Sequence, residues 1–186
     1  MIIINNEEAL RVHCEDVLPE EVGSLIEILE KELDNANRLG KAGIGLAAPQ
    51  IGIAKKIAII RLGSNREYDL NLVNCKVEKG YYPATFKDEG CLSFPGRVET
   101  TTRFQEVLIA GNLVYPQSFV ATGLSAVVCQ HEIDHYSSSL FMDHAIPKVA
   151  PLIKVKVGPN DPCPCGKIDS SLGKVKKFKK CCGKAL

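Results

Sequence analysis

Residues 123–136 restrict the fold more than any other part of this chain. The positions at three- and four-residue spacing share one helical face: Leu124, Val127, Val128 and His131. His135 follows His131 by one helical turn, so the two imidazoles point the same way. We therefore expect a central helix that carries chemistry and around which the rest of the chain is arranged.

The remaining pattern predicts an α+β fold, with short, mostly antiparallel strands around this metal-binding helix. Residues 19–40 have the spacing of an amphipathic helix, and residues 43–50 form a glycine-bearing loop. Strands are predicted at 57–60, 70–73, 107–109 and 119–121, and the stretch 81–103, which holds two prolines, has an irregular pattern.

The chain divides into two predicted domains near residue 158. Alternation over residues 152–157 predicts a last strand, and Gly158-Pro159-Asn160-Asp161-Pro162 then breaks the chain. Residues 151–186 contain nine Lys and two Asp, a charge of +7, which leaves −6 for residues 1–150 because the whole chain carries +1. We expect a catalytic domain over 1–158 and a small basic, cysteine-rich module over 159–186.

The composition indicates a cytoplasmic protein. The first residues lack the positive charge of a secretory leader, and no run of about 18 apolar residues predicts a membrane span. Eight cysteines in such a chain favour metal binding or catalysis over disulfides. Cys14, Cys75 and Cys129 have no motif around them, and we interpret them as packing residues.

His131-Glu132-Ile133-Asp134-His135 is the pattern of a helical metal site. Histidines four residues apart on a helix can bind one ion, and Glu132 beside the first of them can take a proton from a water that the metal activates. The alternative is a pair of solvated or capped helix histidines.

A catalytic metal site needs a third protein ligand and one open position. Forty residues upstream, Cys91 lies in the turn Glu89-Gly90-Cys91-Leu92-Ser93, where a thiolate would complete a Cys/His/His set. Taken alone, Cys91 is more typical of a small buried apolar residue.

Three segments together resemble the motifs of the peptide deformylase family. They are residues 43–50 (Gly-Ile-Gly-Leu-Ala-Ala-Pro-Gln), residues 89–93 (Glu-Gly-Cys-Leu-Ser) and residues 130–135 (Gln-His-Glu-Ile-Asp-His). Their order and separation also resemble those of the family, from about Leu10 to Pro147. The resemblance implies removal of the formyl group from the amino-terminal formyl-methionine of nascent polypeptides, with release of formate.

Carried over by position, the resemblance assigns roles to individual residues. Cys91, His131 and His135 would hold the metal, and Glu132 would be the general base and acid. The Gln50 side chain and the Leu92 backbone N–H would stabilise the oxyanion. The alternative for Gln50 is a structural role, in which its side chain stabilises its own loop.

A methionine side chain needs an apolar slot beside this centre. The resemblance places Ile44, Leu124, Val127 and Val128 in its wall, although the three helix residues are also typical of core. Gly43 and Gly45 would let an extended peptide approach the backbone closely.

Several positions depart from the pattern of the family. Ser138 stands where a glycine is usual and His144 where an arginine is common, and the stretch between Pro95 and Arg103 is slightly short. The sequence gives no partner for His13 or His144, which we interpret as structural or surface residues. None of these departures involves a predicted metal ligand or Glu132.

The last 24 residues predict a second metal site. Cys163, Cys165, Cys181 and Cys182 can supply four thiolates to one structural zinc ion, which would hold together a module with almost no apolar core. The segment resembles the SEC-C zinc motif, except that the spacer of 15 residues between its cysteine pairs is longer than usual. Its lysines favour attraction to a polyanion. The candidate partner is the ribosome, through its RNA or an exit-site protein, or another translation or export partner. A solvated surface is the alternative.

The catalytic metal stays open among zinc, iron(II), cobalt and nickel, which all suit a thiolate with two imidazoles, and the resemblance favours iron(II) in the cell. Two rival functions also stay open. One is a general metallopeptidase, against which the cysteine ligand and the Gln50 loop argue. The other is a non-catalytic adaptor with the same fold, against which the intact ligands and Glu132 argue.

Overall fold

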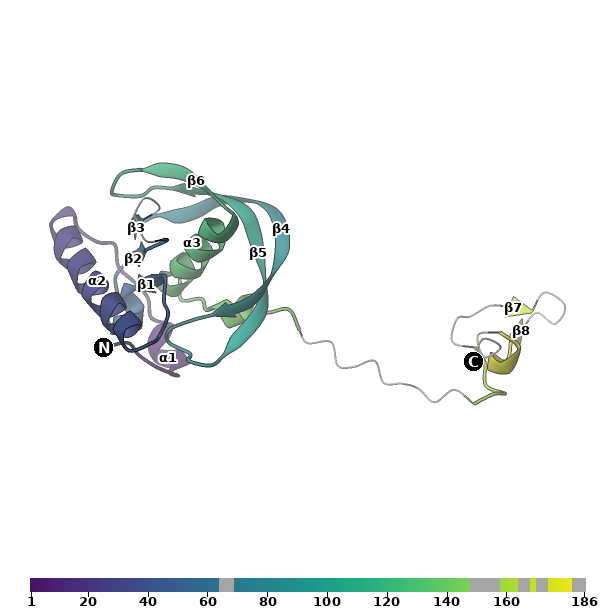
Figure 1. Cartoon of the computed structure of the whole chain (residues 1–186). Helices are drawn as coiled ribbons and strands as arrows, with labels where there is room; N and C mark the ends of the chain where they lie inside the picture. Colours follow the sequence, from purple (N-terminus) through teal and green to yellow (C-terminus); the bar gives the residue numbers. More distant parts are fainter. Residues whose placement is uncertain (64–68, 148–157, 164–167, 170–173, 182–186) are drawn as a thin grey trace. The chain divides into compact units, whose positions relative to one another are not determined.

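The computed structural model describes residues 1–63, 69–147, 158–163, 168–169 and 174–181 (Figure 1). Contacts divide the chain into two compact units, Met1–Ile146 and Pro147–Leu186, which we describe separately. The predicted domain boundary near residue 158 stays a prediction, and the predicted strand at 152–157 lies outside the described residues.

The first unit is built in layers around α3. Its helices and turns are α1 (Glu7–Leu10), η1 (Pro19–Glu21), α2 (Val22–Arg38), η2 (Ala48–Ile51), α3 (Gly123–Tyr136) and η3 (Phe141–His144). Its strands are β1 (Gly45–Ala47), β2 (Ile57–Ile60), β3 (Leu70–Val73), β4 (Lys76–Gly90), β5 (Val98–Ala110) and β6 (Ser118–Thr122). Both sheets, β1-β2-β3 and β4-β5-β6, are antiparallel throughout, which confirms the predicted α+β class.

α3 lies between the two sheets, with β1–β3 on one side and the curved β4–β5 hairpin on the other (Figure 1). α2 packs on the opposite side of β1 and β2 through Leu25, Leu29 and Leu33, as its apolar spacing predicts. Ten of the fourteen residues of α3 are buried, so this helix is central rather than amphipathic. The position of α3 therefore brings its side chains into contact with both sheets.

The irregular pattern of residues 81–103 predicted no strand, but most of this stretch belongs to β4 and β5. Pro83 pairs with Phe104 inside the ladder. β4 is an edge strand of its sheet, and a proline is tolerated at an edge because its missing N–H need not bond to a neighbouring strand. Register shifts near Lys79 and Glu89 also obscure the alternation on which strand prediction depends.

The glycine-bearing segment 43–50 is more regular than predicted, since it contains β1 and the start of η2. The predicted packing cysteines Cys14, Cys75 and Cys129 are all buried in one core cluster with residues of α3. Among the described helices, none is long and apolar enough to cross a membrane.

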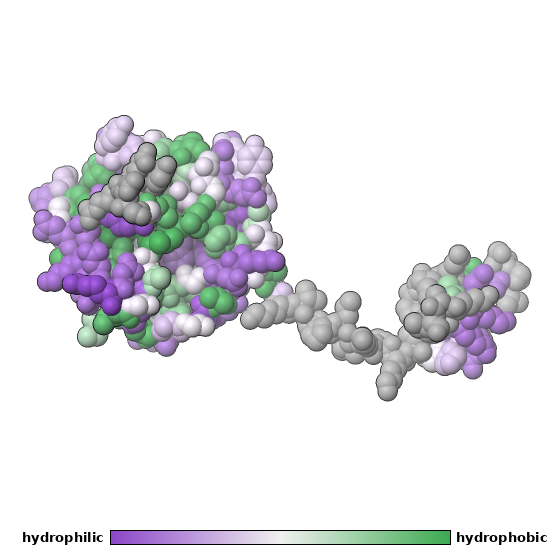
Figure 2. All heavy atoms as spheres, viewed as in Figure 1, coloured by the Kyte–Doolittle hydropathy of each residue, from purple (hydrophilic) through white to green (hydrophobic). Residues whose placement is uncertain are grey.

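The second unit has only short elements in its described part. β7 (Ile168–Asp169) pairs with β8 (Lys174–Val175), and the turn η4 (Phe178–Lys180) follows. The N–H of Cys163 donates to the carbonyl of Lys176 at 2.8 Å. Hydrophilic residues dominate the described surface of this unit in the view shown (Figure 2).

Candidate metal centre

Two elements, β4 and α3, bring together the donor atoms predicted to bind a metal. Cys91 follows β4, whereas His131 and His135 lie one turn apart on α3. One ligand atom from each residue lies within 4.8 Å of those from the other two, and Cys91 Sγ is 3.3 Å from His135 Nε2. Of the residues described, these are the ones that form such a cluster.

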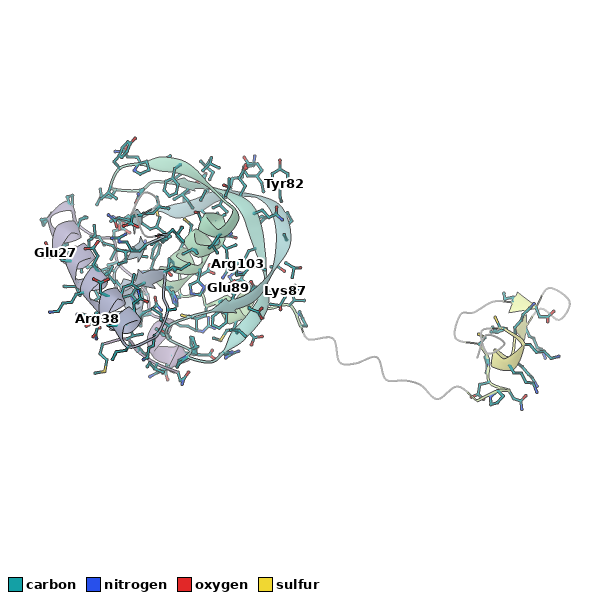
Figure 3. All side chains as sticks on the ribbon, viewed as in Figure 1. Glu27, Arg38, Tyr82, Lys87, Glu89 and Arg103 are labelled. Atoms are coloured by element: carbon teal, nitrogen blue, oxygen red, sulfur yellow. The ribbon has the colours of Figure 1, made fainter. Side chains whose placement is uncertain are left out.

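A buried carboxylate also fixes the orientation of the His131 ring. His131 Nδ1 lies 2.7 Å from Glu89 Oε1, which leaves the other ring nitrogen for a metal. Arg103 holds Glu89 in turn, with Nε and Nη2 donating to its two carboxylate oxygens at 2.9 and 2.6 Å (Figure 3). Thr101 Oγ1 donates to the same carboxylate at 2.5 Å.

This support was missed in the sequence, where Glu89 belonged to a motif but received no role and Arg103 received none. Both side chains are almost fully buried, at 4% and 3% exposure. Burial alone would raise the pKa of Glu89, but hydrogen bonds from His131 and Arg103, together with their charges, lower it to about 2. Glu89 is therefore held as a carboxylate next to the candidate ligand.

Glu132 lies in the same cavity, beside the first histidine. Its Oε2 is buried and has no hydrogen-bond partner among the described residues. Burial raises the pKa of Glu132 to about 7, an effect that the nearby positive charge of His131 opposes and the charges of Asp134 and Glu89 increase. The backbone at Gly45 lies against this carboxylate, since a Cβ there would collide with Glu132 Oε1.

The side-chain amide of Gln50 also points toward the candidate metal ligands. Its Oε1 accepts the N–H of Ala47 at 2.9 Å, and its Nε2 donates to Ser93 Oγ at 3.1 Å and lies 3.3 Å from Cys91 Sγ. The side chain therefore stabilises its own loop and also presents an N–H at the candidate centre. The two interpretations of Gln50 from sequence are compatible in this geometry.

A cavity of about 570 Å³ opens onto these groups. Its lining includes the six residues predicted for substrate binding, namely Gly43, Ile44, Gly45, Leu124, Val127 and Val128, and also Gln50, Cys91, Leu92, His131 and Glu132. Leu124 and Ile44 are about half exposed at its rim, whereas Val127 and Val128 are buried deeper in its wall. The lining thus combines an apolar wall with a polar centre, as small-molecule and peptide sites commonly do.

The residues present fit a divalent metal. A thiol and two imidazoles are a common donor set for such ions and leave a fourth position open. His135 Nδ1 is buried without a partner in the described part of the chain, and burial lowers the pKa of His135, which favours the neutral ring that a metal requires. These contacts place the chain in the class of metal-dependent hydrolases.

Comparison with known proteins narrows this class to one family. The profile described as polypeptide deformylase matches residues 1–150. Peptide deformylase of Hydrogenovibrio crunogenus is 32% identical over 147 residues, which cover 77% of this chain and 83% of that protein. Peptide deformylase 2 of Vibrio cholerae is 34% identical over 148 residues, covering 78% and 86%.

Solved structures agree with this result. A peptide deformylase from Legionella pneumophila superposes with a TM-score of 0.69 at 31% identity, over 79% of this chain and 86% of that one. The Synechococcus elongatus enzyme in complex with actinonin gives 0.68 at 31%, over 80% and 79%. The chain belongs to the peptide deformylase family, whose members remove the formyl group from the formyl-methionine of nascent polypeptides with a divalent metal.

The second predicted metal site is described only in part. Cys163 is buried and Cys181 is half-buried. Cys165 and Cys182 lie outside the described residues. The zinc site of the tail therefore stays a prediction.

Proposed function

We propose that Cys91, His131 and His135 hold the metal for deformylation and that Glu132 moves the proton. The observation that carries this assignment is that ligand atoms of Cys91, His131 and His135 lie within 4.8 Å of one another, beside the cavity that Cys91, His131 and Glu132 line. A bound dication supplies activation of water, by lowering the pKa of that water toward neutrality.

Glu132 takes a proton from the attacking water and returns it to the departing amine. Two observations support this role. Its Oε2 is buried without a partner in the described part of the chain, and the carboxylate lines the cavity next to His131. Gly45 supports the role further, because the absence of a side chain there leaves room for the carboxylate.

Gln50 and the backbone N–H of Leu92 stabilise the oxygen anion that develops on the formyl group. Gln50 is held by Ala47 and Ser93, so its remaining N–H is preorganised near Cys91. Preorganised donors of this kind contribute roughly 2.7–4 kcal/mol each to transition-state stabilisation in measured cases. Loss of the Gln50 amide should therefore lower kcat strongly.

The methionine side chain occupies the apolar part of the cavity, against Val127 and Val128, with Ile44 and Leu124 at the rim. Gly43 and Gly45 line the same cavity, and neither can carry a Cβ without a contact of 2.5 Å or closer to Leu92 or Glu132. The peptide backbone can therefore pass close to this segment.

Iron(II) is the proposed catalytic metal in the cell, and the cytoplasm is the proposed compartment. The thiolate and imidazole donors also suit zinc, cobalt and nickel, so metal analysis of protein purified without oxygen tests the choice. Oxidation of a thiol ligand would inactivate a sample kept in air, which makes anaerobic preparation necessary.

The tail is proposed to be a SEC-C-like module with one structural zinc bound by Cys163, Cys165, Cys181 and Cys182. The bond from the N–H of Cys163 to Lys176 supports it, because it brings the first cysteine next to the segment that leads to the second pair. Metal content tests it directly. We expect two ions in the wild-type chain and one in the double variant Cys163→Ser/Cys181→Ser.

The lysine-rich segment of this module is proposed to attract the ribosome. Five described lysines lie within seven residues of chain: Lys174, Lys176, Lys177, Lys179 and Lys180. Binding through such charges weakens as salt increases. Salt-insensitive binding to ribosomes, or equal binding after substitution of these lysines by glutamine, would contradict this proposal.

The experiment that tests the catalytic proposal is formate release from formyl-Met-Ala-Ser by protein reloaded with iron(II) without oxygen. Activity that Glu132→Ala abolishes supports the assignment. No release from metal-replete protein would overturn it and favour a non-catalytic adaptor. Cleavage of an unformylated peptide by the same sample would favour a general metallopeptidase.

A further inference from the structure

His144, for which the sequence gives no partner, lies at the outer end of a chain of side-chain contacts. Its Nε2 is 3.1 Å from Asp134 Oδ2. The same carboxylate oxygen accepts a hydrogen bond from Arg103 Nη1 at 2.7 Å. His144 belongs to η3, whereas Asp134 lies on α3 directly before His135, so this contact ties the turn after the helix to the helix itself.

The inner end of this chain of contacts is a metal ligand. Arg103 holds both oxygens of Glu89, and Glu89 Oε1 faces His131 Nδ1 at 2.7 Å. From the surface inward, the side chains therefore contact one another in the order His144, Asp134, Arg103, Glu89 and His131. Arg103 and Glu89 are buried, whereas the His144 side chain is 36% exposed, so the contacts run from the surface to the candidate metal centre.

The guanidinium of Arg103 explains how the outer contact can matter at the inner end. The group is planar and its donors have fixed directions, so it satisfies Asp134 and Glu89 together in few orientations. Holding the carboxylate of Asp134 therefore restricts Arg103, and Arg103 restricts Glu89. A hydrogen bond from His144 to Asp134 adds a restraint at the exposed side.

His144 has another polar neighbour besides Asp134. Ser139 Oγ lies 3.4 Å from its Nε2 and also donates to Asp143 Oδ2 at 3.2 Å. Arg11 pairs with Asp143 beyond them, at 2.6 Å. Among the side-chain contacts of His144, Asp134 is thus the one that leads to the metal centre, whereas Ser139 leads to a surface pair.

We propose that His144 is a positioning residue for deformylation, acting through Asp134, Arg103 and Glu89 on the orientation of His131. This inference rests on the proposed function, in which His131 is a metal ligand. His144 does not line the cavity. Its loss should therefore lower kcat and loosen the metal while the KM for the peptide stays unchanged.

The test compares His144→Ala with His144→Gln, whose amide can still donate to Asp134. In His144→Ala we expect kcat to fall by about tenfold and loss of bound zinc to a chelator to accelerate by a similar factor, the lower end of what outer partners of a metal ligand contribute. His144→Gln should restore most of both. His13→Ala removes an exposed histidine elsewhere and serves as the matched control.

A double-mutant cycle with Asp134→Ala separates positioning from general stability. If His144 acts through Asp134, its removal changes kcat little once the acceptor at residue 134 is gone, so the two effects are not additive. Additive effects on kcat, or a lower melting temperature with unchanged kcat and metal retention, would overturn the inference.

Failure of the inference and failure of the proposed function give different results. Wild-type protein that releases no formate contradicts the proposed function, and the rate of zinc loss still tests His144 in that case. Active wild-type protein with an equally active, equally metal-retaining His144→Ala variant contradicts the inference alone.

Discussion

Glu89 Oε1 lies 2.7 Å from His131 Nδ1, and both side chains are buried. A carboxylate that faces one ring nitrogen fixes the proton on that nitrogen and so leaves the other as the metal-binding atom. The tautomer of His131 is thus determined by a residue of β4, across the interface between α3 and the second sheet.

Arg103→Met should lower the free energy of unfolding by about 3–5 kcal/mol, because it leaves the carboxylates of Glu89 and Asp134 in the interior without their cation. Urea unfolding measures the loss. Arg97→Met removes an arginine that is exposed and pairs with Glu99 at 3.3 Å, so its cost should stay below about 1 kcal/mol. Equal losses in the two variants would show that burial of the Arg103 pair has no special importance.

Gly45→Ala should reduce kcat/KM by about a hundredfold, because the new Cβ displaces the Glu132 carboxylate from its position. Formate release measures the effect. Gly23→Ala is the matched control: a Cβ at Gly23 meets nothing within 4 Å, and alanine in a helix should stabilise the fold by about 0.5–1 kcal/mol with no change in rate. Full activity in Gly45→Ala would mean that Glu132 can move without consequence.

Ile3→Pro should slow deformylation, because it removes the N–H that donates to the Gln50 carbonyl at 2.7 Å. The amino-terminal segment also holds the neighbouring loop, through the bond from Asn5 N–H to the Ser93 carbonyl at 2.8 Å. The lost bond itself is worth about 1 kcal/mol. Ile3→Ala keeps the N–H and loses the side chain, so a lower kcat in both variants alike would assign the effect to packing instead.

Acid should weaken the Arg11–Asp143 pair. The hydrogen bonds from Arg11, more than the opposing effect of burial, hold the pKa of Asp143 well below its usual range. Because the folded pKa is lower than the unfolded value of about 3.9, the pair stabilises the fold above that value and loses its effect as pH falls through the folded pKa. Both side chains are about one-third exposed, so the effect stays below about 1 kcal/mol.

Comparison of wild-type protein with Arg11→Gln measures this effect. The difference in free energy of unfolding should be constant near neutral pH and shrink below about pH 4. Lys76→Gln, which removes a more exposed partner of Glu78, should show little difference at any pH. A difference between wild type and Arg11→Gln that persists at low pH would contradict the assignment to Asp143.

The sequence was sufficient for elements whose pattern is local. The spacing of leucines predicted α2, and β2 and β3 are short apolar or β-branched runs, so all three were confirmed. β4 and most of β5 were missed, apart from the predicted strand at 107–109, because their long ladder contains a proline at an edge and two register shifts, which hide the alternation. The local sequence pattern of β4 cannot show that this strand is stabilised by pairing with β5, which is thirteen residues long.

Prediction from local sequence has the same limit at the candidate metal site. The residues that converge on the cavity were named from motifs, because each motif is contiguous. Glu89 and Arg103 are 14 residues apart on two strands, and Asp134 is 31 residues beyond Arg103. In the sequence, Glu89 follows Asp88 and Arg103 lies among threonines and polar residues, so neither stands out locally as buried. Their pairing becomes apparent only after the strands and their register are known.

Because α3 lies between the two sheets, its position also determines when the metal centre can form during translation. Gln50, Cys91 and His135 come from the early, middle and late parts of the first unit, and η3, which follows α3, closes the contacts with β5. A growing chain that has not yet emerged past His144 lacks part of this arrangement, whatever it has already folded. The proposed metal ligands can therefore meet only after the chain has been translated through His135.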